Sequence, residues 1–115
     1  MVTLERLREL MLSLPETTEE SHFEKTSFSV KKKIFATYDH EHKRACLKLS
    51  EIDQDVFSAP DKSIIYPVDN KWGLQGWTNI ELTKVHKDTF KDALITAYCE
   101  VAPPKLAKMV RNLET

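Results

Sequence analysis

The sequence predicts an α+β fold in which a mainly antiparallel sheet of about five strands carries its helices on one face. Apolar residues follow a helical period near both ends of the chain and change to strict alternation between residues 26 and 49. The expected elements also lack the regular strand–helix alternation that builds a parallel sheet. We expect all 115 residues, 1–115, to form a single domain, because a chain of this length buries roughly two thirds of its unfolded surface.

The first expected helix ends before Pro15. Its apolar residues recur at helical spacing, namely Leu4, Leu7, Met11 and Leu14. Thr3 supplies a hydroxyl that can cap the first turn. The next stretch, 15–24, is polar and acidic without an apolar period, so we expect a connection there.

A meander of three strands is expected to follow. Phe28 and Val30 alternate with serines, and after a turn at Lys31 and Lys32 a second β-rich run occupies 34–38. A third alternating run, 45–49, follows a polar turn.

A short helix is expected between this meander and Pro60. Ser50 and Asp53 fit a capping box, in which a hydroxyl and a carboxylate satisfy free amides at the start of a helix. The apolar side of this helix is expected to comprise Ile52, Val56 and Phe57.

Two strands and two helices complete the expected order. The strands, 64–68 and 77–82, flank a loop that holds Trp72, Gly73 and Gly76. One helix is expected to begin near Asp88 and a second to follow the Pro103–Pro104 pair. Their apolar residues lie at helical intervals: Phe90, Leu94, Ala97 and Val101, then Leu106, Val110 and Leu113.

Composition narrows the possible partners and the compartment. A net charge of −1 argues against strong general attraction to polyphosphate, which depends on clustered Lys and Arg. No apolar run approaches the roughly 20 residues of a membrane span, and residues 1–14 mix charges with leucine. We therefore expect a cytoplasmic monomer without a membrane partner, in which the widely separated Cys46 and Cys99 are reduced structural thiols.

Signals for catalysis, cofactors and metal are absent from the sequence. His40 and His42 lie in one turn without the third and fourth ligands of a closed metal site. Neither cysteine lies in a nucleophile motif. We expect no cofactor and no metal, and an enzyme would need a deep pocket joining His22 or another titratable group to a second polar residue.

Short motifs along nearly the whole chain resemble the MmcQ/YjbR family. The first half contributes His22-Phe23-Glu24-Lys25, Ser27-Phe28, Lys33-Ile34-Phe35-Ala36 and Leu47-Lys48-Leu49. The second half contributes Trp72-Gly73, Gly76-Trp77, Ala97-Tyr98, Val101-Ala102-Pro103 and Lys105. The resemblance implies a compact α+β fold related to the CyaY-like shape, a DNA-binding role and no established reaction.

The chain departs from the family pattern at two places. Relatives commonly carry arginine between Gly73 and Gly76, where this chain has Leu74 and Gln75. The usual glycine of the first hairpin turn is replaced by Lys31 and Lys32. The CyaY comparison would also suggest an acidic iron-binding ridge on the first helix, but Arg6 and Arg8 interrupt Glu5 and Glu9 there.

The candidate nucleic-acid site is the basic hairpin. Lys31, Lys32 and Lys33, with Lys25 nearby, form the densest positive charge and can reach phosphates from a projecting turn. The alternative is a solvated turn whose charges discourage aggregation. A second basic series on the last expected helix, Lys105, Lys108 and Arg111, is also consistent with solubility alone.

The candidate partner or ligand site is the open face of the sheet. Trp77 alternates with Ile80 and Leu82, so we expect its indole to point away from the core beside Asn79. Such a face offers an aromatic platform to a protein or a small ligand. Alternatively, Trp72 folds over Trp77 as a small second core. His22 joins these tryptophans as a candidate because it lies in the family motif.

Overall fold

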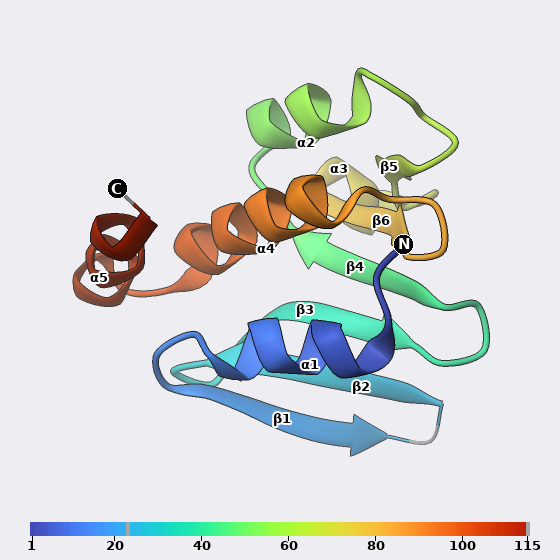
Figure 1. The fold of residues 1–115 in the computed structure, drawn as a ribbon. Coiled ribbons are helices and arrows are strands. Elements are labelled where there is room, and N and C mark those ends of the chain that lie inside the picture. Colours follow the sequence, from blue (N-terminus) through green and yellow to red (C-terminus); the bar gives the residue numbers. More distant parts are fainter. Residues whose placement is uncertain (23, 115) are drawn as a thin grey trace.

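The computed structural model describes residues 1–22 and 24–114, without the side chains of the last two of these. The described residues form one six-stranded sheet, entirely antiparallel, and five helices (Figure 1). The strands are β1 (Thr17–His22), β2 (Lys25–Val30), β3 (Lys33–Asp39), β4 (Arg44–Lys48), β5 (Ile65–Pro67) and β6 (Trp77–Glu81). The helices are α1 (Leu4–Leu12), α2 (Glu51–Ser58), α3 (Lys71–Leu74), α4 (Lys87–Val101) and α5 (Pro104–Glu114).

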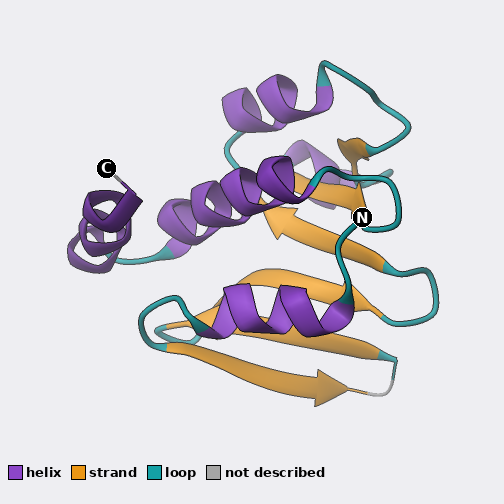
Figure 2. Cartoon of the chain, in the orientation of Figure 1, coloured by secondary structure: helices purple, strands orange, loops and turns teal. Residues whose placement is uncertain are grey.

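The spatial order of the strands is β1-β2-β3-β4-β6-β5. Helix α1 contacts β1, α4 contacts β3 and β4, α2 contacts β5, and α5 packs on α4. Figure 2 shows these longer helices over one face of the sheet. The predicted α+β class with helices on one face is confirmed. Phe23, quoted for the family resemblance, and the side chain of Leu113 lie outside the described part.

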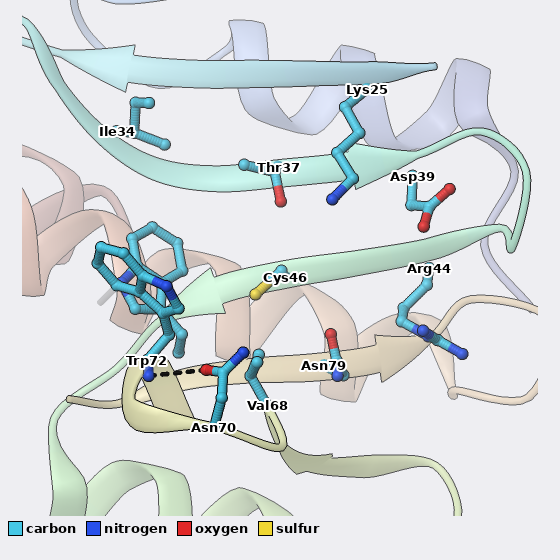
Figure 3. A pocket seen from close by; sticks show the side chains of 11 residues that line it. Lys25, Ile34, Thr37, Asp39, Arg44, Cys46, Val68, Asn70, Trp72 and Asn79 are labelled. Atoms are coloured by element: carbon cyan, nitrogen blue, oxygen red, sulfur yellow. Dashed lines mark hydrogen bonds between the residues drawn. The ribbon is translucent and has the colours of Figure 1, made fainter. Parts of the chain in front are cut away.

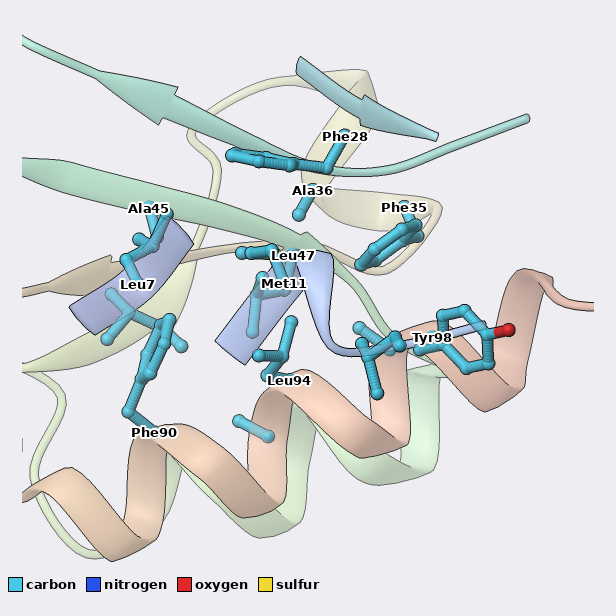
Figure 4. Packing of buried hydrophobic residues seen from close by; sticks show 14 of the residues in the cluster. Leu7, Met11, Phe28, Phe35, Ala36, Ala45, Leu47, Phe90, Leu94 and Tyr98 are labelled. Carbon is cyan, nitrogen blue, oxygen red and sulfur yellow. The ribbon is translucent and has the colours of Figure 1, made fainter. Parts of the chain in front are cut away.

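The core lies between the sheet and helices α1 and α4. Phe28 and Leu47 from the strands meet Leu7 and Phe90 from the helices, and all four are fully buried (Figure 4). Tyr98 packs edge-on against Phe35 with 5.4 Å between ring centroids. The periods of two and of 3.6 residues therefore identified the apolar faces of these elements correctly.

The stretch 15–24 is not only a connection, as predicted, because it contains the edge strand β1. Its residues are polar and mostly exposed, so it lacks the apolar alternation that marks a half-buried strand. Backbone pairing with β2 over its whole length forms the strand instead. The Arg8 guanidinium, 2.9 Å from the Glu19 carboxylate, ties β1 to α1.

Helix α2 begins at the predicted cap but buries only part of the predicted face, since Phe57 packs against the core. The Ser50 hydroxyl accepts the Asp53 amide at 3.1 Å. Ile52 and Val56 are 76% and 62% exposed, whereas Gln54 and Ser58 are buried. The prediction failed for Ile52 and Val56 because Gln54 makes hydrogen bonds inward that an apolar side chain could not make.

A bulge in the first hairpin changes which residues of β3 face the core. Pairing shifts between Phe28 and Ser29, so that Phe28 pairs with Ala36 and Ser29 with Ile34. Phe35 is the extra residue, and both Phe35 and Ala36 are buried. The shift turns Ile34 to the open face, where it is 46% exposed.

None of the described helices is both long enough and apolar enough to cross a membrane.

Candidate binding face of the sheet

The face of the sheet opposite the helices is defined here as the open face. Strand register and alternation place every second residue on it. Its members are Thr18, Glu20 and His22 of β1, Lys25, Ser27 and Ser29 of β2, Ile34, Thr37 and Asp39 of β3, Arg44, Cys46 and Lys48 of β4, Tyr66 of β5, and Trp77, Asn79 and Glu81 of β6. Two grooves run along this face, and all the candidate residues except Lys33 line one or the other.

The first, called the tryptophan groove, has a volume of about 590 Å³. Trp77 from β6 and Trp72 from α3 line it together with Lys25 and Asp39. Figure 3 shows Trp72 at the end of the groove that lies far from Asp39. Trp77 is half-buried on the open face as predicted, whereas Trp72 is 51% exposed. The groove therefore has aromatic walls that are open to solvent.

Two glycines let the α3 segment, which carries Trp72 and leads into Trp77 of β6, approach the sheet. A Cβ on Gly73 would lie 1.9 Å from the Val68 carbonyl oxygen, and one on Gly76 would lie 1.8 Å from that of Leu49. Gly76 also has φ of +104°, a conformation that side chains rarely adopt. Only glycine therefore fits at these two positions between the tryptophans.

Gln54 holds this loop from the helical side. Its buried Nε2 lies 3.0 Å from the Gly73 carbonyl oxygen, 3.2 Å from that of Trp77 and 3.1 Å from the Thr78 hydroxyl. One side chain thus connects α2, α3 and β6. The tryptophans are positioned by a buried polar contact as well as by the glycines.

Several polar groups of the tryptophan groove are free to bind a ligand. Within the described chain, the side-chain carboxamide of Asn79, the hydroxyl of Thr37 and the amine of Lys25 make no hydrogen bond. Asn70 uses its Oδ1 to accept the Trp72 amide at 2.8 Å, which leaves its NH₂ group unused. The groove therefore combines aromatic surface with several unpaired donors.

The second, called the lysine groove, covers β1 to β3 and has a volume of about 700 Å³. Lys25, Lys31 and Lys32 line it together with hydroxyl side chains and His22. The Lys31 amine lies 2.6 Å from the Glu16 carboxylate, whereas Lys32 makes no ion pair with any described residue. His22 is paired with Glu20 at 3.3 Å.

The hairpin turn at this groove has an unusual backbone for its residues. Lys31 and Lys32 have φ of 49° and 67°, the left-handed conformations of a type I′ turn, which favours Asn-Gly. Lys33 pairs with the core residue Val30 and so emerges on the helix-covered side of the strand. The predicted lysine triplet therefore does not converge on one surface.

Lys25 connects the two grooves, which also share Ile34 and Thr37. Its amine reaches across β3 toward Cys46 and favours the thiolate there, but burial dominates and raises the pKa of Cys46 to about 11. Burial likewise raises the pKa of Cys99. Both thiols are free, as predicted, and protonated at neutral pH.

The far end of the open face carries a polar cluster. Arg44 donates to the Glu81 carboxylate at 2.8 Å, and the Tyr66 hydroxyl donates to the same oxygen. Burial opposes ionisation of Glu81, but these hydrogen bonds outweigh it and lower the pKa of that carboxyl. The polar side chains of this cluster bond to one another. The unpaired polar groups of the open face therefore lie nearer the tryptophans.

The turn histidines do not form a metal site. His42 is paired with Asp39 at 2.8 Å, and the His40 Nε2 lies 2.8 Å from the Thr26 hydroxyl. The described residues contain no group of three or more metal-ligating side chains.

Sequence reasoning missed Ile34, Thr37, Val68 and Asn70 as parts of the groove. Only the bulge places Ile34 on the open face, and only the fold of the α3 loop brings Asn70 beside Trp72. The signal that pointed to this groove was the loop holding Trp72, Gly73 and Gly76, followed by a strand that begins at Trp77.

Comparisons with known proteins agree with this architecture. The crystal structure of Deinococcus radiodurans protein DR2400, a DUF419 domain, matches with a TM-score of 0.75 and 23% identity, over 87% of this chain and 78% of that one. No curated protein matches the chain. A family model described as YjbR matches residues 12–100, from the end of α1 almost to the end of α4. The chain therefore belongs to the YjbR family.

Proposed function

We propose that this protein is a binding module that holds single-stranded nucleic acid on the open face of its sheet. Bases stack in the tryptophan groove, and phosphates lie against Lys25, Lys31 and Lys32 in the lysine groove. One observation carries the proposal: two tryptophans and three lysines that are far apart in the sequence, Trp72 and Trp77 on one side and Lys25, Lys31 and Lys32 on the other, line two grooves joined at Lys25.

A single strand suits this face better than a duplex. Trp77 is half-buried on β6, beside β4, so a base has to leave its stack to lie flat against the ring. Stacking on aromatic side chains contributes about 1–3 kcal/mol per base and tolerates any sequence. A duplex keeps its bases paired and offers this groove only its backbone.

The charge on the face implies modest affinity. Lys31 must exchange Glu16 for a phosphate, and Glu20 and Asp39 border the same surface. With three amines contacting phosphate, log K is expected to fall with log salt with a slope of about −2, at about −0.7 per contact. The net charge of −1 agrees with local rather than general attraction.

Fluorescence anisotropy with a labelled 12-nucleotide strand and the matching duplex tests the proposal. We expect the strand to bind more tightly than the duplex, and Trp77→Ala and Lys25→Ala each to weaken strand binding. Lys33→Ala is the matched control, since Lys33 lies outside both grooves and should bind as the wild type does. Absence of strand binding at low salt, or equal losses in Lys33→Ala and Lys25→Ala, would contradict the proposal.

A second candidate is a protein partner on the same face. Trp72 and Ile34 are 51% and 46% exposed at the tryptophan groove, which gives a partner an apolar contact. Capture of a protein that is lost in Trp77→Ala and retained in Lys25→Ala would favour this function over nucleic acid.

A further inference from the structure

We infer that a third groove, between α2 and α3, is a site for an arginine side chain on a basic segment of a partner protein. This α2–α3 groove has a volume of about 600 Å³ and is lined by residues of α2, of α3 and of the turn between β5 and α3. Figure 1 shows these elements together at the edge of the sheet opposite β1. The inference goes beyond the proposed function and does not depend on it.

The α2–α3 groove gathers negative charge that has no counterpart. Glu51, Asp55 and Asp69 line it, and their side chains make no hydrogen bond or ion pair with any described residue. Among the described residues, no Lys, Arg or His side chain lines the groove. The charge is therefore left for a cationic ligand to neutralise.

A buried carboxamide oxygen gives the groove a fixed acceptor. Gln54 lines the groove and is 7% exposed. Its Nε2 contacts Gly73, Trp77 and Thr78 at 3.0, 3.2 and 3.1 Å, which holds the carboxamide in one orientation. Its Oε1 accepts no hydrogen bond from the described residues, yet it is not sealed off, because the fully enclosed polar side-chain atom without a partner among them is the Thr17 hydroxyl. A ligand in the groove can therefore donate to Oε1.

These acceptors suit an organic cation better than a metal ion. The part of the chain that the structure describes has no group of three or more His, Cys, Asp or Glu side chains that could hold a metal. A guanidinium carries five N–H donors in one plane and no acceptor, so it can bind the Gln54 oxygen and a carboxylate at the same time. A lysine ammonium is a compact point charge, so arginine uses acceptors that lie apart more fully.

Exposed apolar side chains beside these acceptors indicate a protein segment as the source of the cation. Leu74 lines the groove and is 77% exposed. Ile52 and Val56 on α2 are 76% and 62% exposed. Together with Met1 they are the four most exposed large apolar side chains of the described chain. An arginine stem and its neighbours in a segment would cover this surface while the guanidinium meets the acceptors.

A labelled octapeptide of alternating arginine and alanine, titrated by fluorescence anisotropy, tests the charge requirement. The comparison peptide has citrulline in place of each arginine, which keeps the shape of the side chain and removes its charge. We expect the arginine peptide to bind at least about tenfold more tightly, because hydrogen bonds between charged groups are about twice as strong as neutral ones. Equal binding of the two peptides would overturn the inference.

Removal of two carboxylates tests the named groove. Glu51→Gln with Asp55→Asn changes two exposed residues and should weaken binding of the arginine peptide about tenfold, as expected for loss of charged hydrogen bonds. Glu5→Gln with Glu100→Gln is the matched control, since it removes the same charge from exposed residues outside the groove. The control should weaken binding less than about twofold, because salt screens distant charges. Equal losses in both double variants would show general attraction and overturn the site.

Nuclear magnetic resonance locates the bound peptide and separates a segment from a free cation. The side-chain NH₂ signals of Gln54 and the backbone amide of Leu74 should shift with the arginine peptide and stay in place with the citrulline peptide. Shifts confined to the open face would overturn the location. N-acetylarginine amide should bind more weakly than the octapeptide, and equal affinity would overturn the assignment to a protein segment.

Discussion

The hairpin turn shows at the scale of single residues how local backbone preference and placed charge conflict. Lys31 and Lys32 both have left-handed backbone, although side chains with a Cβ are disfavoured there by about 1 kcal/mol or more each. The turn therefore carries two lysine amines at the lysine groove, although Asn-Gly would fit its backbone better.

Replacing the pair by Asn-Gly should stabilise the protein and weaken its binding. We expect Lys31→Asn with Lys32→Gly to raise the free energy of unfolding by about 1–2 kcal/mol, because Asn-Gly fits a type I′ turn. Urea unfolding measures this change, and strand anisotropy should show weaker binding. Lys43→Gly, at φ of 51° in another turn, is the control that should leave binding unchanged.

Cys46 gives a second prediction at this scale. With its pKa raised to about 11 by burial, the thiol should react with iodoacetamide at pH 8 about a hundredfold more slowly than an unperturbed cysteine, because only the thiolate reacts. The rate should rise about tenfold per pH unit between pH 8 and 10. Peptide mass spectrometry in a Cys99→Ser background measures it, and a plateau below pH 9 would contradict the burial.

The elements show which features the sequence could predict. Helix α1, the first hairpin, β4, β6 and α4 were predicted because apolar residues with a clear period drive their burial. β1 was missed because backbone pairing alone defines it. The predicted face of α2 was right for Phe57 and wrong for Ile52 and Val56. A glutamine, which has no place in an apolar period, makes the inward contacts of this helix.

The burial of Gln54 predicts unequal effects within α2. Gln54→Leu should lower the free energy of unfolding by about 2–3 kcal/mol, because the Gly73 carbonyl and the Thr78 hydroxyl lose a buried donor. Ile52→Ala on the same helix should change it by less than about 0.5 kcal/mol, since Ile52 is exposed. Urea unfolding of both variants measures the two losses in unfolding free energy. A larger loss in Ile52→Ala than in Gln54→Leu would support the orientation expected from the apolar residues.

The candidate site could be predicted only in part for the same reason. Alternation correctly placed Trp77 on the open face, and the lysines were visible as a charge run. Trp77 and the groove-lining lysines meet in joined grooves because of the bulge after Phe28 and the α3 loop. Both features are set by tertiary contacts. Lys33 lies on the other side because strand register, not proximity in sequence, decides the face.

At the scale of the whole molecule, acid stability should depend on the cluster that joins β4, β5 and β6. Glu81 has a lowered pKa in the folded protein, so the unfolded chain binds more protons at acidic pH. Its contribution is present above the unfolded pKa of about 4.5 and is lost as pH falls through the folded value.

Glu81→Gln should therefore be less stable than the wild type at pH 7, by about 1 kcal/mol, and the difference should shrink toward pH 3. Urea midpoints at pH 7, 5, 4 and 3 measure this convergence. Glu51→Gln changes an exposed residue of α2 without an ion pair in the described structure, and at pH 7 it should lie within about 0.5 kcal/mol of the wild type. A difference for Glu81→Gln that is constant over this range would refute the assignment.

The acidic outer strand β1 has a consequence for how copies of this protein meet. If two β1 strands aligned antiparallel about their centres, Glu19 of one copy would lie opposite Glu20 of the other, and like charges facing across strands repel. At the opposite margin, β5 has three residues and ends in Pro67, which has no amide to donate. Both margins therefore discourage growth of the sheet into fibrils by addition of further copies.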